Sequence, residues 1–193
     1  MANTIRAICV FCGSGTGTDP NYSREADRFG RALARRNIHL VYGGSNIGLM
    51  GRLSAAARDA GGRVTGVIPE KIAEHVPAQD GVDMEVVPDM HRRKARMYAL
   101  ADGFVSLPGG IGTLDETFEA WTWSQLGYHA KPLALVNIGG YYDALIRFLD
   151  SVTEQGFLRA HQRDSLIVDT EPEAVLDRME AWSPPLEMKW ERG

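Results

Sequence analysis

The sequence predicts an α/β fold in which a doubly wound parallel sheet carries helices on both faces. Three observations predict it. Short strand-like runs alternate with amphipathic helical runs along the chain. The first run, residues 5–11, is almost continuously apolar, which is typical of a strand buried on both faces. Glycine-rich turns follow three of the strand-like runs, at the edge where open parallel sheets bind their ligands.

Apolar spacing and turn residues place the elements of the first half of the chain. Residues 22–36 predict a helix because Ala26, Phe29 and Leu33 share one side. Residues 70–89 are less regular, since prolines and a glycine interrupt them. The other elements expected here are a strand at 39–42, a turn at 43–48, a helix at 49–60, a strand at 63–68 closed by Pro69, a short helix after it, and an extended run at 84–87.

The second half continues the same alternation. It predicts helices at 90–101, 114–126, 142–154 and 172–182, and strands at 103–107, 133–137 and 166–168. No internal repeat or low-complexity linker breaks the pattern. We therefore predict one Rossmann-like domain over residues 1–182 with right-handed crossovers. Ser183 and the two prolines after it begin a short C-terminal tail, residues 183–193.

Composition narrows the class of protein. At 193 residues, with 44% hydrophobic and 24% charged residues, the chain suits one ordinary globular domain. Its net charge of −4 disfavours nucleic acid or a membrane surface as partner. No apolar run approaches the roughly 18 residues of a membrane span, and the N-terminus lacks a signal-peptide pattern. We expect a cytoplasmic protein.

Two cysteines, Cys9 and Cys12, stand in a C-x-x-C spacing. A redox motif of this kind usually opens a helix, whereas here Cys9 belongs to the first strand and Cys12 begins a turn. We expect reduced, structural cysteines. Two cysteines also cannot complete a four-ligand zinc site, and no H-E-x-x-H motif is present, so no metal is expected.

Residues 108–116, Pro-Gly-Gly-Ile-Gly-Thr-Leu-Asp-Glu, follow a strand-like run and open a helical one. Glycines let the backbone approach a ligand, and a helix start offers free N–H groups and the positive end of its dipole. This predicts a phosphate site. Glu116, expected in the first turn, either acts on the bound ligand or merely complements the dipole, as Asp115 also could. The binding residues expected in this motif are Gly109, Gly110, Ile111, Gly112 and Thr113.

Two further glycine-rich turns are expected beside this motif. Gly13 and Ser14 belong to one, and Gly43 and Gly44 to the other, so an extended site for one ligand is predicted. A Walker A loop is disfavoured because Leu49 occupies its lysine position. The dinucleotide fingerprint is also broken, since Thr18 replaces its third glycine.

Basic residues crowd the predicted helix start at 90–96, where the dipole disfavours cations. This is either a solvated face or a cluster that an anion or a carboxylate compensates. Arg93 and Arg96 share a face by their spacing and could bind phosphate as a fork. His91 is a weaker candidate as a general base.

Arg93-Lys94 in an M-H-x-R-K context, together with P-G-G-x-G-T-x-x-E at 108–116, resembles the signature of the Lonely guy family of cytokinin riboside 5′-monophosphate phosphoribohydrolases. The similarity extends over residues 9–14, 42–44 and 48–51, Lys131-Pro132, and Gly139-Gly140-Tyr141-Tyr142. The resemblance implies hydrolysis of the N-glycosidic bond of an N6-substituted AMP, without metal or cofactor. It implies Arg93 and Glu116 as catalytic residues. It implies that the substrate site includes Glu70, Met90, Lys94, residues 110–113 and Thr122.

Family members are typically homodimers, so the resemblance implies a dimer as well. Trp121, Trp123, Leu126 and Tyr128 supply either its apolar interface or core. Some relatives have been labelled lysine decarboxylases, but no lysine here lies in a recognisable pyridoxal motif. Two alternatives remain open: a broader purine 5′-monophosphate (AMP) nucleosidase, and a non-catalytic nucleotide or cofactor carrier.

Overall fold

The computed structural model describes residues 4–76 and 80–184, so most of the predicted tail and Pro77 lie outside the described residues. Seven strands form one sheet in the order β4-β3-β2-β1-β5-β6-β7, and every pairing is parallel. The predicted fold class is confirmed. The strands are β1 (Ala7–Phe11), β2 (His39–Tyr42), β3 (Val64–Pro69), β4 (Asp83–Val87), β5 (Gly103–Ser106), β6 (Leu133–Val136) and β7 (Leu166–Asp169).

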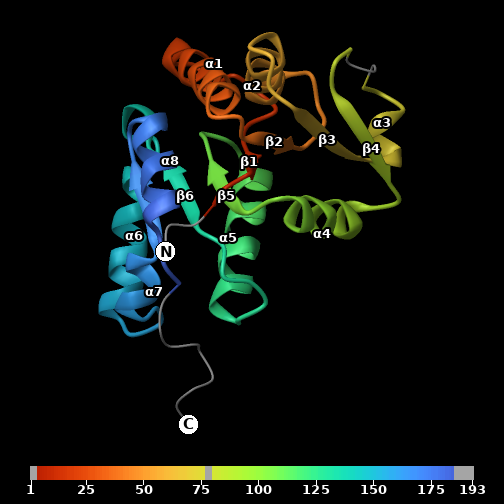
Figure 1. Cartoon of the computed structure of the whole chain (residues 1–193). Coiled ribbons are helices and arrows are strands. Elements are labelled where there is room, and N and C mark those ends of the chain that lie inside the picture. Colours follow the sequence, from red (N-terminus) through yellow and green to blue (C-terminus); the bar gives the residue numbers. More distant parts are fainter. Residues whose placement is uncertain (1–3, 77–79, 185–193) are drawn as a thin grey trace.

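Helices cover both faces of this sheet because successive strand residues point to opposite sides. Ile8 and Val10 of β1 pack in one apolar cluster, and Cys9 and Phe11 in another. The first cluster includes α1 (Pro20–Arg35), α2 (Gly48–Asp59) and α8 (Pro172–Ala181), and the second includes α4 (Met90–Leu100), α5 (Ile111–Gln125) and α6 (Asp143–Glu154). Figure 1 shows α1 and α2 on one side of the central strands and α4 and α5 on the other.

The strand order creates a switch point between β1 and β5. From β1 the chain runs outward through β2 and β3 to β4, and α4 then returns it to β5 on the other side of β1. The connection after β1 uses one face of the sheet and the connection after β5 uses the opposite face. The carboxyl ends of β1 and β5 therefore open into a crevice, which is where doubly wound sheets bind ligands.

Most predicted boundaries are correct within one or two residues, and β2 matches its prediction fully. Helix α5 is the informative exception, because it begins at Ile111 rather than at residue 114. Gly110 is its extended N-cap, and Gly112 lies in its first turn. The prediction assigned Gly112 to the turn before the helix, because glycine is a poor helix former. Glu116 consequently lies in the second turn, which weakens its interpretation as a simple dipole partner.

The short helix expected after Pro69 is the four-residue helix α3 (Glu70–Ala73). Two other short elements were not predicted, the 3₁₀ turn η1 (Ile138–Gly140) and the helix α7 (Ala160–Asp164). Each is too short to show a period in the sequence. Among the described residues, no helix is long and apolar enough to cross a membrane.

The aromatic residues that were proposed for either the core or an interface differ in how far they are buried. Trp121 is buried in the core, and Trp123 packs edge-on against Tyr98 at 5.2 Å between ring centroids. Tyr128 is 75% exposed. Trp121 therefore cannot supply an interface, whereas Tyr128 is available for one.

Candidate active site

A cavity of about 290 Å³ opens in the crevice at the carboxyl ends of the strands. The cavity is lined by the loop after β1, by residues of α2 and α4, and by the first two turns of α5. We call it the Glu116 cavity. Its lining residues are Cys12, Ser14, Met50, Met90, Arg93, Gly110, Ile111, Gly112, Thr113, Asp115 and Glu116.

Arg93 and Glu116 meet inside this cavity, although 23 residues separate them. The Arg93 Nη1 donates to Glu116 Oε1 at 2.5 Å, and both side chains are only 10% exposed. The Arg93 Nε donates to the Val67 carbonyl at the end of β3, at 3.1 Å. The guanidinium is thus fixed from two sides, and Gly43 packs so tightly behind it that any side chain there would collide with it.

Burial raises the pKa of the Glu116 carboxyl above its usual 4.5, because desolvation disfavours the charged form. The nearby Arg93 guanidinium opposes this shift, and Asp115 adds to it. A carboxyl of this kind is a functional-site candidate, since a purely structural ion pair would not need to face a cavity.

The raised pKa predicts an acid limb in the pH dependence of kcat/KM, with its midpoint above 4.5. As pH falls through that midpoint the required carboxylate is protonated and activity is lost. Because Asp115 raises and Lys94 lowers the pKa of Glu116, Asp115→Asn should move the limb to lower pH and Lys94→Gln to higher pH. Steady-state kinetics between pH 4 and 8 measure this, and shifts in the same direction in both variants would contradict it.

The N-terminus of α5 is a candidate anion site. Its N-cap, Gly110, makes no side-chain capping bond, and residues 110–113 line the Glu116 cavity. Two neighbouring helix starts at this edge, those of α1 and α2, are occupied. Asp19 caps α1, and the carbonyl of Gly13 accepts from the first residues of α2. In the described chain, α5 is therefore the helix start at the switch point that can bind a phosphate.

The three glycines of this motif differ in whether packing requires a residue without a side chain. A side chain on Gly109 would collide with Thr113, so packing requires glycine there. A Cβ on Gly110 or Gly112 would meet no atom within 4 Å, and neither residue has a positive φ. Nothing in the fold requires glycine at these two positions, but their missing side chains keep the cavity open.

Two other basic residues of α4, Lys94 and Arg96, pair with carboxylates, and of these carboxylates Asp115 alone lines the cavity. Arg96 forms a two-bond pair with Glu85 at 2.6 and 2.9 Å. Lys94 bonds Asp115 and Glu119, at 3.2 and 2.9 Å. The compensation expected from the crowding of charges is confirmed, and the proposed Arg93–Arg96 phosphate fork is not formed. His91 is exposed and does not line the cavity.

The structure brings together most, but not all, of the predicted site residues. Glu70, Lys94 and Thr122 do not line this cavity or the second cavity described below. Gly43 and Gly44 are buried and do not line either cavity. Three lining residues were not predicted: Cys12, Met50 and Asp115. In the sequence, each of these three residues lies in or next to a glycine-rich motif, and this position could have indicated that it lines the site. Burial raises the pKa of the Cys12 thiol, and both cysteines are free, as expected of structural cysteines.

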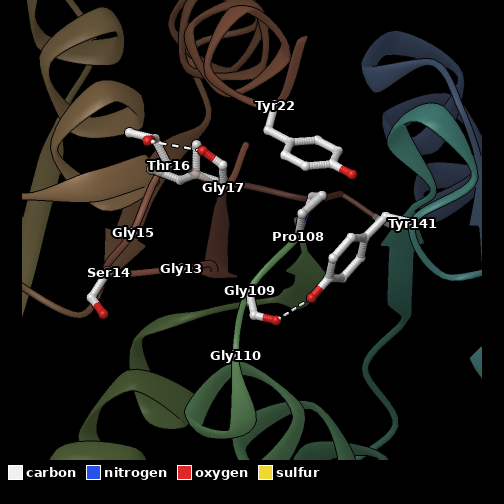
Figure 2. Close-up of a pocket in the computed structure, with 11 residues that line it drawn as sticks. Gly13, Ser14, Gly15, Thr16, Gly17, Tyr22, Pro108, Gly109, Gly110 and Tyr141 are labelled. Carbon is white, nitrogen blue, oxygen red and sulfur yellow. Dashed lines mark hydrogen bonds between the residues drawn. The ribbon is translucent and has the colours of Figure 1, made fainter. Parts of the chain in front are cut away.

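A second cavity, of about 310 Å³, adjoins the first and shares Ser14 and Gly110 with it. Figure 2 shows Tyr22 and Tyr141 on its aromatic side and the loop from Gly13 to Gly17 on the other. We call it the tyrosine cavity. Both cavities lie at the carboxyl ends of β1 and β5.

The fold and the site define a Rossmann-like α/β protein with an open helix N-terminus beside a buried carboxylate. Residues 50–179 match the family described as "Possible lysine decarboxylase". A probable cytokinin riboside 5′-monophosphate phosphoribohydrolase of Oryza sativa subsp. japonica is 42% identical, over 99% of this chain and 81% of its own. A cytokinin riboside 5′-monophosphate phosphoribohydrolase of Arabidopsis thaliana is 44% identical, over 92% and 83%. This chain belongs to the Lonely guy family of these phosphoribohydrolases.

Solved structures share the fold at lower identity. The molybdenum cofactor binding protein of Rippkaea orientalis has a TM-score of 0.70 at 23% identity, over 92% of this chain and 97% of its own. The Moco carrier protein of Chlamydomonas reinhardtii has a TM-score of 0.69 at 22% identity, over 92% and 99%. These likenesses support the architecture alone.

Proposed function

We propose that this protein hydrolyses the N-glycosidic bond of cytokinin riboside 5′-monophosphates and releases the free base and ribose 5-phosphate. The observation that carries the proposal is the buried Arg93–Glu116 pair next to the open N-terminus of α5. Relatives 40–44% identical over nearly the whole chain bear the name of this activity.

The proposed mechanism assigns separate tasks to these groups. The N–H groups at the start of α5 bind the 5′-phosphate and hold the ribose in place. Cleavage of the C1′–N bond builds positive charge on C1′ and the ring oxygen, as in glycosidases. The Glu116 carboxylate stabilises that charge and orients the water that adds to C1′. The bond electrons leave with the base, which takes up a proton.

Arg93 serves this mechanism as a fixed cation. Arginine is a poor general acid, so a group other than Arg93 supplies the proton that the base takes up. The bonds of Arg93 to Glu116 and to the Val67 carbonyl instead aim the carboxylate into the cavity. The positive charge also lowers the pKa of Glu116, against the larger effect of burial.

The "lysine decarboxylase" description of the family finds no support in the lysines. A pyridoxal enzyme needs a lysine free to form a Schiff base at its site. Lys94 is paired with two carboxylates, and Lys131 donates to the Tyr98 carbonyl at 2.7 Å. Among the residues that the structure describes, no lysine lines the Glu116 cavity or the tyrosine cavity.

Base release from N6-isopentenyl-AMP, its unphosphorylated riboside and AMP, followed by chromatography, tests the proposal. Release from the isopentenyl nucleotide alone supports a phosphate-dependent cytokinin-activating hydrolase. Release from AMP at an equal or higher rate would replace it with a general nucleotide nucleosidase. Binding without any product would favour the carrier alternative.

Gly112→Ala should separate folding from activity. The new methyl group meets no protein atom, and alanine favours a helix over glycine by about 0.5–1 kcal/mol, so stability should be equal or higher. The same methyl group projects into the cavity and should raise KM for the nucleotide about tenfold or more, the value of one charge-assisted hydrogen bond to phosphate. Thermal unfolding and steady-state kinetics measure both.

Gly109→Ala is the matched comparison, since that methyl group collides with Thr113. It should lower the unfolding temperature as well as activity. A Gly112→Ala protein with unchanged KM would show that phosphate does not bind at this helix start.

We also propose a cytoplasmic homodimer, following the family. Two free, buried cysteines fit a reducing compartment. Exposed apolar side chains suited to an interface include Ile111 and Tyr128, which are 83% and 75% exposed. Size-exclusion chromatography with light scattering tests the dimer, and a monomer at micromolar concentration rejects it.

A further inference from the structure

The Gly-Gly-Tyr-Tyr segment that follows β6 has no task in the proposed mechanism, yet it reaches the phosphate-binding loop. Gly139 and Gly140 adopt positive φ values of 60° and 77°, which turn the chain sharply after the strand. Tyr142 is then buried, and its hydroxyl donates to the Leu107 carbonyl at 2.6 Å. This anchors the segment to the end of β5.

Tyr141 extends from this anchor to the next part of the same loop. Its hydroxyl donates to the Gly109 carbonyl, and its ring packs edge-on against Tyr142 and Tyr22, at 4.9 and 5.7 Å between centroids. Figure 2 shows this bond at the boundary of the tyrosine cavity, directly before α5. The two tyrosines therefore hold the loop between β5 and α5 at two carbonyl groups, those of Leu107 and Gly109.

The Tyr141 bond decides the orientation of one peptide group. The described chain has no cis peptide bond, so the Gly109 C=O and the Gly110 N–H point in opposite directions. With the carbonyl directed at Tyr141, the N–H is directed away from it. Glycines on both sides would otherwise let this peptide rotate freely, because glycine accepts both signs of φ. A rotated peptide would present a carbonyl oxygen, and thus partial negative charge, on the side now occupied by the N–H.

We propose that Tyr141 is a positioning residue for the phosphate site. It locks the Gly109–Gly110 peptide so that the Gly110 N–H, together with the first N–H groups of α5, faces the phosphate of the bound nucleotide. Tyr141 itself does not touch the phosphate. This inference rests on the proposed assignment of a phosphorylated ligand to the start of α5.

Calorimetric binding of AMP and adenosine tests the inference, in a Glu116→Gln background that removes turnover. Tyr141→Phe deletes the hydroxyl and keeps the ring. It should weaken AMP about tenfold, the value of one charge-assisted hydrogen bond, and leave adenosine unchanged. Tyr22→Phe is the matched control. Its hydroxyl lies in the same cavity and bonds no described residue, so both ligands should bind as before.

Several outcomes would overturn the inference. AMP bound equally well by Tyr141→Phe, or adenosine weakened by the same factor, would show that the bond does not serve phosphate binding. So would a crystal structure of the variant with the peptide orientation unchanged. Tyr141→Leu, which also removes the ring, should discriminate against AMP at least as strongly. These are binding measurements, so they remain decisive if the protein proves not to hydrolyse nucleotides. If the Tyr141-intact protein binds AMP no more tightly than adenosine, the phosphate site itself is rejected, and this inference with it.

Discussion

Glu116→Gln should lower kcat for N6-isopentenyl-AMP by about 10²–10⁴-fold, the range expected when a positioned acid–base group is lost. Glutamine keeps the shape of the side chain. Its amide oxygen can still accept the hydrogen bond that Arg93 donates to Glu116 at 2.5 Å. It removes the negative charge that stabilises the oxocarbenium-like transition state. The amide is also the sharper test than alanine, because alanine would leave Arg93 buried without its partner.

The control for this variant is Glu119→Gln, the same substitution one turn further along α5. Glu119 accepts from Lys94 and Tyr98 outside the cavity, and its amide can still accept from both. Its kcat should stay within a few-fold of the unmodified protein, as is usual for substitutions that keep their hydrogen bonds. Circular dichroism and thermal unfolding establish that both variants fold. A near-normal kcat for Glu116→Gln would reject Glu116 as the catalytic carboxylate.

Arg93→Met should be damaging in two separate ways. First, it leaves the Glu116 carboxylate buried without a countercharge, and breaking a buried pair in this way costs about 3–5 kcal/mol of stability. Second, the pKa of Glu116, which Arg93 holds down, should rise further. The carboxyl would then be protonated over more of the working pH range, and kcat should fall together with stability.

The double variant Arg93→Met with Glu116→Gln separates these effects. Removing both charges should recover much of the stability lost in Arg93→Met, and should recover no activity. Chemical denaturation and single-turnover kinetics measure the two quantities. If Arg93→Met raises KM and leaves kcat unchanged, Arg93 binds substrate and does not orient Glu116.

Helix α5 shows where reasoning from the sequence stops. The motif at 108–116 correctly predicted a glycine-rich turn and a helix start, because these depend on neighbouring residues. It left open whether Glu116 acts on a ligand or only complements the helix dipole. The helix start was placed three residues too late, since the low helix propensity of Gly112 was outweighed by the position of the loop. That loop position depends on Tyr141 and Tyr142, about 30 residues further along the chain.

The residues of α4 show the same limit for charges. The sequence indicated that Arg93, Lys94 and Arg96 need compensation, because the helix dipole disfavours cations at a helix start. It could not assign their partners. Packing of α4 against α5 gives Glu116 to Arg93 and gives Glu119 to Lys94, and packing against β4 gives Glu85 to Arg96. The arginine that enters the cavity is thus distinguished from its neighbours only by tertiary contacts.

By itself the sequence determined the fold class, the three glycine-rich turns at one edge of the sheet, and the two motifs that carry the family resemblance. These follow from local rules, since apolar periodicity and glycine conformation act within a few residues. Only the tertiary structure decided which two strands form the switch point, which helix start stays open, and which carboxylate meets Arg93. These depend on strand order and side-chain packing between distant segments, which local periodicity does not encode.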